Sequence, residues 1–370
     1  MLKFASTRRR NLVVVYALVA AAEGLPAALL LPVRTLSLTR PIGAVSTLGV
    51  LASSAAAASL LGGWLARRSP SAVVRRGLAL AGVGSWGWAT GTGFDEAWAL
   101  VVGAGVGLVQ PGVLALGCVE VRPGRQGREV GLYGAAASVG LGAAGLAGAF
   151  FAGAVEVGLV GLGALLLVSV LAVRSPPSAS FRESTARVRL PWNAWSLALT
   201  AGALRYGVVA SLPILAVTQW GTTRRIAALL LLAGVGAAVP CKLIITAATD
   251  RFPANRVVQT CAFAVLICGG AVFESTTALT GTSGAVVFIG LVAALLSLAN
   301  LQALRLDAID PLQLGVVRCA QLGGGAATLM LSSLVVGEDA RVWVYVLLSS
   351  PLLVSGFLPS LRRWSSADGR

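Results

Sequence analysis

The sequence contains no histidine, and few of its residues carry charge. Only 12% of the 370 residues are Asp, Glu, Lys or Arg, whereas hydrophobic residues make up 56% and the mean hydropathy is +0.85. A soluble domain carries about 25% charged residues, so this composition excludes a water-soluble globule and a disordered chain. The absence of His also excludes imidazole-ligated metals and acid–base catalysis by His. A polytopic membrane protein is the class that remains.

Cysteines and acidic residues are also scarce. The five cysteines all lie in apolar stretches and none forms a CxxC pair, so we interpret them as small apolar residues rather than as metal or redox sites. The 29 basic residues outnumber the 14 acidic ones, for a net charge of +15. Because these bases lie at the ends of apolar segments, we expect no nucleic-acid partner. The sequence predicts no metal and no cofactor.

Motifs of membrane enzymes and ATP-driven pumps are missing as well. The sequence has no HExxH, no Walker motif and no pair of carboxylates within an apolar segment. A membrane hydrolase or glycosyl transferase would need such groups clustered together. We therefore predict that the protein is not an enzyme.

Long apolar runs fill most of the chain, and each can cross a bilayer as a helix of about 20 residues. Twelve such segments use most of the length and leave no room for a separate soluble domain. We predict an all-α integral membrane protein with helices at about 11–33, 41–66, 74–93, 97–119, 129–152, 155–173, 193–219, 225–249, 256–275, 282–304, 311–336 and 341–361.

The distribution of Lys and Arg predicts the orientation of these helices. With alternating loops, 22 of the 29 basic residues fall on the side of both termini and 5 on the other side. The remaining two, Arg205 and Lys242, lie inside predicted spans. Basic loops stay in the cytoplasm, so both termini are predicted to be cytoplasmic.

A polar segment at 174–192, RSPPSASFRESTARVRLPW, divides the chain into nearly equal parts. We therefore predict an N-terminal six-helix bundle over 1–173, a cytoplasmic linker over 174–192 and a C-terminal six-helix bundle over 193–370. Equal spacing supports a duplication: Asn11 precedes Glu23 by twelve residues, and Asn193 precedes Arg205 by twelve. Parallel six-helix repeats are the plan of one large class of transporters.

Two loop motifs resemble those of the major facilitator superfamily. That family carries Gly-x-Leu-Ala-Asp-Arg-x-Gly-Arg-Arg after its second helix, and residues 63–70 read GWLARRSP here, with Gly63 and Arg68 matching. Arg67 stands where the family has Asp. A second copy at 249–256, TDRFPANR, keeps Asp250 and Arg251. The resemblance implies two six-helix bundles related by a pseudo-twofold axis along the membrane normal.

In this family the two loops latch the halves together on the cytoplasmic face. The resemblance therefore implies gating roles for a set of loop residues: Gly63, Arg68, Asp250, Arg251 and Arg256. An acid near a helix N-terminus is stabilised by the helix dipole, so we expect Asp250 to contact a neighbouring helix end. Because Arg67 replaces the acid, we expect the first loop to make no equivalent contact through its own side chain.

The predicted fifth helix is rich in glycine, with Gly140, Gly142, Gly145 and Gly148. This pattern resembles the fifth helix of the superfamily's antiporters, although small residues at such spacing also serve plain helix packing. The pattern favours antiport.

Ionisable residues deep in a membrane are usually functional or paired. Glu23 lies twelve residues into the predicted first helix, roughly 18 Å at 1.5 Å per residue, and Arg205 lies equally deep in the seventh. In the superfamily the first, fourth, seventh and tenth helices line a central cavity. The resemblance thus implies that Glu23 and Arg205 face each other across it, where Glu23 takes up a proton or cation and Arg205 holds a negative group. The alternative is a structural salt bridge.

Other polar residues are candidates for the same cavity. Tyr206 follows Arg205, Gln110 lies in the predicted fourth helix and Asn300 in the tenth, where Asn300 and Gln302 cannot both face the cavity. Lys242 could bind substrate or extend to the membrane surface. We interpret Arg318 as an anchor at the end of the eleventh helix.

We predict a secondary active transporter that moves a small organic solute by alternating access, with proton-coupled export as the leading hypothesis. The alternatives are a proton-coupled importer of an anionic metabolite, or a non-transporting receptor, scaffold or cofactor-delivery partner on the same fold. The expected partners are a small-molecule substrate, protons and the lipid bilayer. We expect a monomer in a bacterial plasma (inner) membrane.

Overall fold

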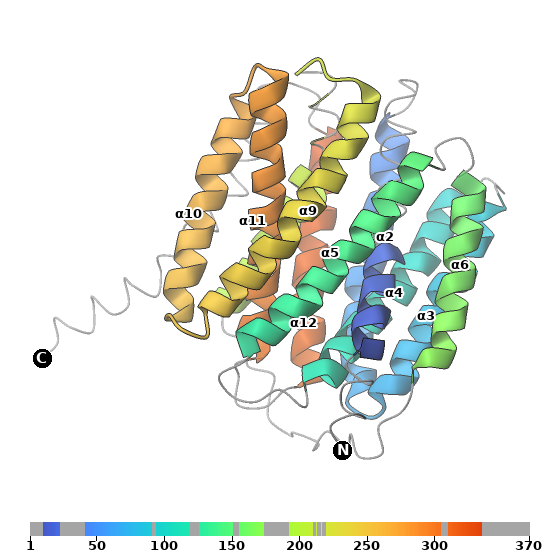
Figure 1. The fold of residues 1–370 in the computed structure, drawn as a ribbon. Coiled ribbons are helices and arrows are strands. Elements are labelled where there is room, and N and C mark those ends of the chain that lie inside the picture. The colour runs from blue at the N-terminus through green and yellow to red at the C-terminus, as the bar shows by residue number, and fades with distance from the viewer. Residues whose placement is uncertain are drawn as a thin grey trace, which may run out of the picture.

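The computed structural model of the protein is helical, and the residues that it describes form no strand (Figure 1). The described residues are 10–22, 41–90, 94–118, 126–150, 155–173, 192–209, 212, 216, 220–304 and 310–334. The helices are Arg10–Ala22, α2 (Pro41–Ala66), α3 (Pro70–Ala89), α4 (Asp95–Cys118), α5 (Gln126–Phe150), α6 (Val155–Ala172), α7 (Trp192–Gly202), η1 (Ala203–Val209), α9 (Arg224–Ala248), α10 (Ala254–Phe273), α11 (Ala278–Leu304) and α12 (Pro311–Leu334).

Each segment predicted up to residue 336 contains a helix in the described part of the chain. The largest differences at a helix start are in α3, which begins at Pro70 rather than at the predicted 74, and in α11, which begins at Ala278 rather than at 282. Proline suits the first turn because that turn needs no backbone N–H donor and proline's fixed φ is helical. The predicted helix 341–361 and almost all of the linker 174–192 lie outside the described residues.

The predicted helix 193–219 changes its winding within the membrane. It is α-helical over Trp192–Gly202 and then a π-helix over Ala203–Val209. A π-helix hydrogen-bonds to the fifth residue rather than the fourth, and such segments occur frequently at functional sites. Arg205 lies in this wider segment, so the local winding affects where its side chain points.

Helices pack both within and between two parts of the chain, the first ending at residue 173 and the second beginning at residue 192. Within the first part α4 packs on α2 and α3, and α3 on α6, while in the second part α11 packs on α9 and α10. Between the parts, α2 packs most extensively on α12 and α5 on α9, with smaller contacts of α4 with α12 and of α5 with α11. The helices α5 and α9 run side by side along their length (Figure 1). Small residues permit such close packing: a Cβ on Gly107 of α4 would overlap the carbonyl oxygen of Ala55 on α2.

Apolar side chains cover much of the outer surface. Leu171 of α6 is 83% exposed and Ile244 of α9 is 68% exposed. Four described helices are long and apolar enough to cross a membrane by themselves, within Thr47–Ala66, Asp95–Gly117, Ala254–Phe273 and Ala278–Gln302. An apolar surface of this kind suits lipid rather than water.

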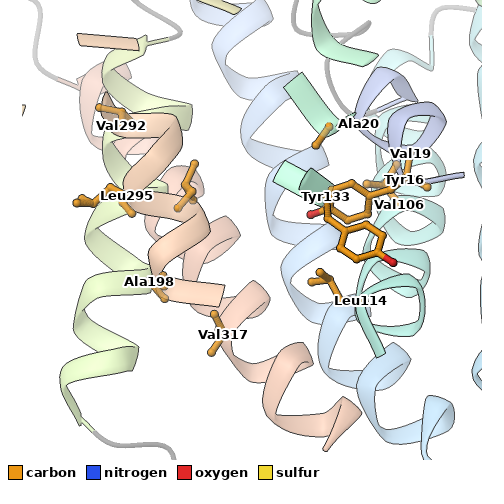
Figure 2. Close-up of a cluster of buried hydrophobic side chains, with 14 of the residues drawn as sticks. Tyr16, Val19, Ala20, Val106, Leu114, Tyr133, Ala198, Val292, Leu295 and Val317 are labelled. Atoms are coloured by element: carbon orange, nitrogen blue, oxygen red, sulfur yellow. The ribbon is translucent and has the colours of Figure 1, made fainter. Parts of the chain in front are cut away.

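The buried core is apolar on both sides of the molecule. Figure 2 shows Tyr16 of the first helix beside Tyr133 of α5, with ring centroids 5.9 Å apart and an edge-to-face angle of 71°. On the other side of the same view, Ala198, Leu295 and Val317 belong to α7, α11 and α12. Aromatic pairs in this arrangement are favourable beyond their buried area.

Candidate functional site

A polar cavity lies where helices from both parts of the chain meet. The first helix, α4 and α5 line it from one side, and η1, α9, α11 and α12 from the other. Its free space is about 20 Å³, which holds a water molecule rather than an organic solute. Its lining residues are Tyr16, Ala20, Gln110, Gly134, Ala137, Arg205, Lys242, Leu296, Ser297, Asn300, Arg318 and Gln321.

Arg205 reaches this cavity from the π-helix η1. Its neighbour Leu204 is fully buried, whereas Arg205 itself is only partly buried. Its depth in the predicted seventh helix, together with the family resemblance, predicted Arg205 in a central cavity. Tyr206 belongs to η1 as well, but its side chain lies outside what the structure describes, and so does Glu23.

Lys242 is one of the most deeply buried charges among the described residues, with 2% of the side chain exposed. Its Nζ donates to the carbonyl oxygen of Gly134 at 2.8 Å and to Oγ of Ser138 at 2.8 Å. Both acceptors lie on α5, whereas Lys242 lies on α9. The ammonium therefore holds the two parts of the chain together beside the cavity and does not extend to the membrane surface.

Arg318 is also buried, with 5% of the side chain exposed, and it lines the cavity. Its Nη1 donates to Oε1 of Gln321 at 3.0 Å. The amide nitrogen of Gln321 in turn donates to Oδ1 of Asn300 at 3.1 Å and to the carbonyl oxygen of Leu296 at 3.3 Å. This chain of hydrogen bonds fixes the guanidinium, so our interpretation of Arg318 as an anchor at a helix end was wrong.

The tenth predicted helix presents Asn300 to the cavity, while Gln302 is not among the lining residues. From the fourth helix, Gln110 is buried against the cavity. It precedes Pro111, which has no N–H to donate within α4. These neutral amides add hydrogen-bonding capacity next to the charged groups.

The described lining of the cavity is positively charged. It contains three cationic residues, Arg205, Lys242 and Arg318, and no acidic residue among the positions that the structure describes. All three cations come from the second part of the chain. Tyr16 and Gln110 are the residues with polar side chains that the first part contributes to the described lining.

Two contacts between the parts lie at the lower end of the molecule in Figure 1, which we call the latch face. In the first, Asp250 follows the end of α9 and meets the N-terminus of α5. Its Oδ1 accepts from the backbone N–H of Gly127 at 2.9 Å, and its Oδ2 from that of Arg128 at 3.1 Å. These N–H groups have no partner within the helix, and the helix dipole favours a carboxylate there. The predicted contact of Asp250 with a helix end is confirmed.

The second contact corrects the expectation for Arg67. The Nε of Arg67, just after α2, donates to Oδ1 of Asp310 at 2.8 Å, and its Nη2 pairs with Oδ2. Asp310 also caps α12, because Oδ1 accepts from the backbone N–H of Leu312 at 3.0 Å. The hydrogen bond with Asp310 raises the pKa of Arg67. The first loop thus makes an equivalent contact with its own side chain, through a partner at the start of α12.

Gly63 lies at the crossing of α2 and α12, where the backbones nearly touch. A Cβ at Gly63 would come within 2.7 Å of the carbonyl oxygen of Pro311 and 3.1 Å of the Cα of Gly315. A Cβ at Gly315 would in turn meet the carbonyl oxygen of Ser59 at 2.5 Å. Only glycine fits at this close crossing of the two backbones.

The other predicted gating residues make weaker contacts. Arg68 lies over the ring of Trp64, with its Cζ 5.5 Å from the ring centroid. Arg251 and Arg256, which follow Asp250 in the sequence, are exposed. Their gating roles stay predictions, since neither lies in the contact that Asp250 makes with α5.

Solved structures of membrane transporters share this architecture. A single-residue variant of the E. coli fucose:proton symporter FucP matches over 95% of this chain and 98% of its own, with a TM-score of 0.72 and 15% identity. FucP in its outward conformation matches over 95% and 98%, with a TM-score of 0.69 and 14% identity. The human organic anion transporter MFSD10 matches over 95% and 99%, with a TM-score of 0.73 and 14% identity.

Neither a family model nor a curated protein sequence matches the chain. The likeness to the solved structures therefore concerns the fold, and it extends over nearly the whole chain. It agrees with the resemblance of the loop motifs at 63–70 and 249–256 to those of the major facilitator superfamily. The chain is an integral membrane protein with the fold of the major facilitator superfamily.

Proposed function

We propose that the protein is a secondary transporter, which exports a small organic solute by alternating access and couples this movement to protons. The polar cavity between the two parts of the chain carries the proposal, together with the two contacts that close the latch face beneath it. A cavity too small for a solute must open on one side or the other before it can bind and release one. Opening by movement of one part against the other is the transport cycle of this fold.

The latch face is built from contacts that can break without disrupting a core. Each latch consists of a few charge-assisted hydrogen bonds at helix ends, worth about 1.5–3 kcal/mol apiece before solvent screening. At the crossing of Gly63 with Gly315 the two backbones meet directly, with no side chain on either glycine. Water can replace these polar partners when the face opens. The energy difference between closed and open states therefore lies in the range that a bound solute can offset.

Proton coupling is assigned to Glu23 on sequence grounds. Tyr16 and Ala20 line the cavity from the first helix. Residues spaced as 16, 20 and 23 share one face of a helix, and the predicted helix 11–33 includes Glu23. A carboxylate in low dielectric holds a proton more readily, and a nearby arginine opposes this. Movement of Arg205 toward or away from Glu23 would then release or admit a proton.

Export is supported by the glycine-rich α5, which resembles the fifth helix of antiporters in the superfamily. Gly140 of α5 lies against the first helix, where a Cβ would overlap the carbonyl oxygen of Ala17. The helix that carries the predicted proton site thus packs directly on the glycine-rich helix. A shift of either helix would therefore change this contact between Gly140 and Ala17.

Flux in proteoliposomes tests the proposal. Vesicles containing the full-length protein are loaded with a mixture of small organic acids, amines and sugars, and an imposed pH gradient drives exchange that is followed by mass spectrometry. We expect at least one solute to move against its gradient when protons move down theirs. Glu23→Gln should abolish this proton-driven movement but keep passive exchange, and Arg205→Ala should reduce both. Glu274→Gln, which changes an exposed carboxylate outside the cavity, is the matched control.

Three outcomes separate the alternatives. Unchanged pH dependence in Glu23→Gln would show that Glu23 does not couple protons. Accumulation on the opposite side of the membrane would make the protein an importer. A folded protein that exchanges no solute under any gradient would be a receptor, scaffold or delivery partner on this fold.

A further inference from the structure

We propose that the end of α2 on the latch face binds an anionic phospholipid, whose phosphate contacts Arg68 while Trp64 lies beside the headgroup. The juxtaposition that carries this inference is an exposed arginine over an exposed tryptophan, at the point where an apolar span ends. The site lies outside the cavity, and the inference does not depend on the proposed transport function.

Trp64 and Arg68 lie close to the level of the membrane surface. The part of α2 that is long and apolar enough to cross a bilayer covers Thr47–Ala66. Trp64 lies two residues before the end of this span and Arg68 two residues after it. Tryptophan is enriched at the level of the lipid headgroups. An arginine just beyond the span is therefore placed to reach a lipid phosphate.

Arg67 and Arg68 are neighbours in the sequence, but their partners differ. Arg67 pairs with Asp310, whereas the guanidinium of Arg68 lies over the ring of Trp64, 5.5 Å from its centroid. No carboxylate among the described residues pairs with Arg68. The sequence also has no acidic residue between Glu23 and Asp95. The side chain of Arg68 is exposed, so its N–H donors can bind a group from outside the protein.

The ring of Trp64 holds the guanidinium without satisfying it. A cation over an aromatic face is attracted by the electrons of the ring, which supply no oxygen acceptor for the N–H groups. The planar guanidinium can donate two parallel hydrogen bonds to phosphate oxygens. A phosphate at this position would therefore add to the contact with Trp64 rather than replace it.

The outer face of α2 offers groups in the order in which a phospholipid needs them. Trp64 is 48% exposed, and Leu60 and Leu61, one turn earlier, are exposed as well. Residues three and four apart are neighbours on a helix surface. Leucine side chains thus lie where acyl chains would run, followed by tryptophan at the glycerol level and Arg68 at the phosphate.

The charge around this site favours an anionic lipid over a zwitterionic one. Residues 67–76 contain four arginines and no acidic residue, whereas the corresponding loop at 249–256 contains two arginines and one aspartate. Arg76 on α3 is exposed and, in the described part of the chain, has no acidic partner. Basic residues at the membrane surface attract anionic lipids. The larger excess of positive charge assigns the lipid to the first loop.

Quenching by brominated lipids tests the inference. The purified full-length protein is reconstituted in vesicles of phosphatidylcholine and phosphatidylglycerol, with bromine on the acyl chains of one lipid at a time. Bromine quenches tryptophan fluorescence on contact, so the difference between wild type and Trp64→Phe isolates the signal of Trp64. We expect phosphatidylglycerol to be preferred about fivefold over phosphatidylcholine beside Trp64.

Further variants separate the headgroup contact from folding and from general charge. Arg68→Gln should remove most of the preference, and Arg68→Lys, which keeps the charge, should retain part of it. Arg10→Gln, which removes an exposed arginine at the start of the first helix, is the matched control and should leave the preference unchanged. A thermal unfolding midpoint within the wild-type range shows that a variant is folded.

The inference is overturned when Trp64 is quenched equally by both lipids, or when the preference survives unchanged in Arg68→Gln. Soluble glycerol 3-phosphate is added as a further probe. If it displaces phosphatidylglycerol from Trp64 at millimolar concentration, the site binds a free phosphate group and not a lipid. None of these measurements requires a transported solute, so their outcome is separate from that of the proposed function.

Discussion

The two latches occupy corresponding places in the two parts of the chain, yet their charges are arranged differently. At the end of α9, Asp250 contacts the bare N-terminus of α5 through two backbone N–H groups. At the end of α2, Arg67 contacts Asp310, and it is Asp310 that caps the N-terminus of α12. Both contacts place a carboxylate at a helix N-terminus, that of α5 in the first contact and that of α12 in the second. Asp250 belongs to the part of the chain opposite α5, whereas Asp310 belongs to the same part as α12.

Under the proposed transport cycle, this difference decides which hydrogen bonds each helix loses when the latch face opens. When α9 moves away, Asp250 moves with it, and α5 loses the acceptor at its N-terminus. When α2 moves away, Asp310 stays on α12 and keeps its bond to the N–H of Leu312. The α12 helix therefore starts equally well in both states, whereas α5 is better capped in the closed state. Arg67 therefore still makes a contact between the two parts of the chain, in which its partner Asp310 supplies the carboxylate.

The largest effect is expected for Asp310→Ala. This change removes the cap of α12 and leaves the partly buried Arg67 without its carboxylate. Together these losses should destabilise the closed state by about 2–3 kcal/mol. Hydrogen exchange at residues 311–316 and the thermal unfolding midpoint in detergent measure it. Asp310→Asn keeps a capping oxygen and should lose about half as much. If the amides of residues 311–316 exchange as slowly in Asp310→Ala as in the wild type, Asp310 does not both cap α12 and stabilise Arg67.

An intermediate effect is expected for Asp250→Ala. The N–H groups of Gly127 and Arg128 lose their acceptor, which should cost about 1–2 kcal/mol. Amide exchange should rise at the first turn of α5 and not at the first turn of α12, which keeps its own cap. Equal changes at both helix starts would show that the two latches are not separable.

The smallest effect is expected for Arg67→Gln. Arg67 is 28% exposed, so water screens its pair with Asp310, and the loss should be about 0.5–1 kcal/mol. Arg67→Asp should do more harm, because it brings two carboxylates together. Combining Arg67→Asp with Asp310→Ser should recover the closed state, since the carboxylate introduced after α2 could then contact the α12 N-terminus as Asp250 contacts α5. Thermal unfolding midpoints of the single and double variants measure the recovery. A double variant less stable than Arg67→Asp alone would contradict this interpretation of the comparison.

The helices were predictable because their apolar runs are long and end at Pro, Gly or basic residues. The depth of Arg205 and Lys242 was predictable too, since both charges interrupt such runs. The winding of η1 was not predictable, because a π-helix has no sequence period of its own over seven residues. Glu23 is predicted from the same depth argument and lies outside the described residues.

The sequence could not predict which residues far apart in the chain contact each other. Arg67 and Asp310 are 243 residues apart, and nothing local at Arg67 indicates a carboxylate at the start of another helix. Arg318 was misinterpreted for a similar reason. It lies two turns from Pro311, near a predicted helix end, and only the packing of α11 on α12 shows that Gln321 and Asn300 hold it inside the cavity.

Transport by a molecule with its latch face cross-linked tests the central claim most directly. Arg128→Cys on α5 and Phe252→Cys after α9 place two exposed thiols across the latch that Asp250 forms. The solute flux of the double variant is measured before and after a short bis-maleimide joins them, with each single variant treated in the same way. The account predicts that cross-linking stops flux in the double variant alone. Undiminished flux through the cross-linked protein would show that the latch face need not open, and would contradict the account.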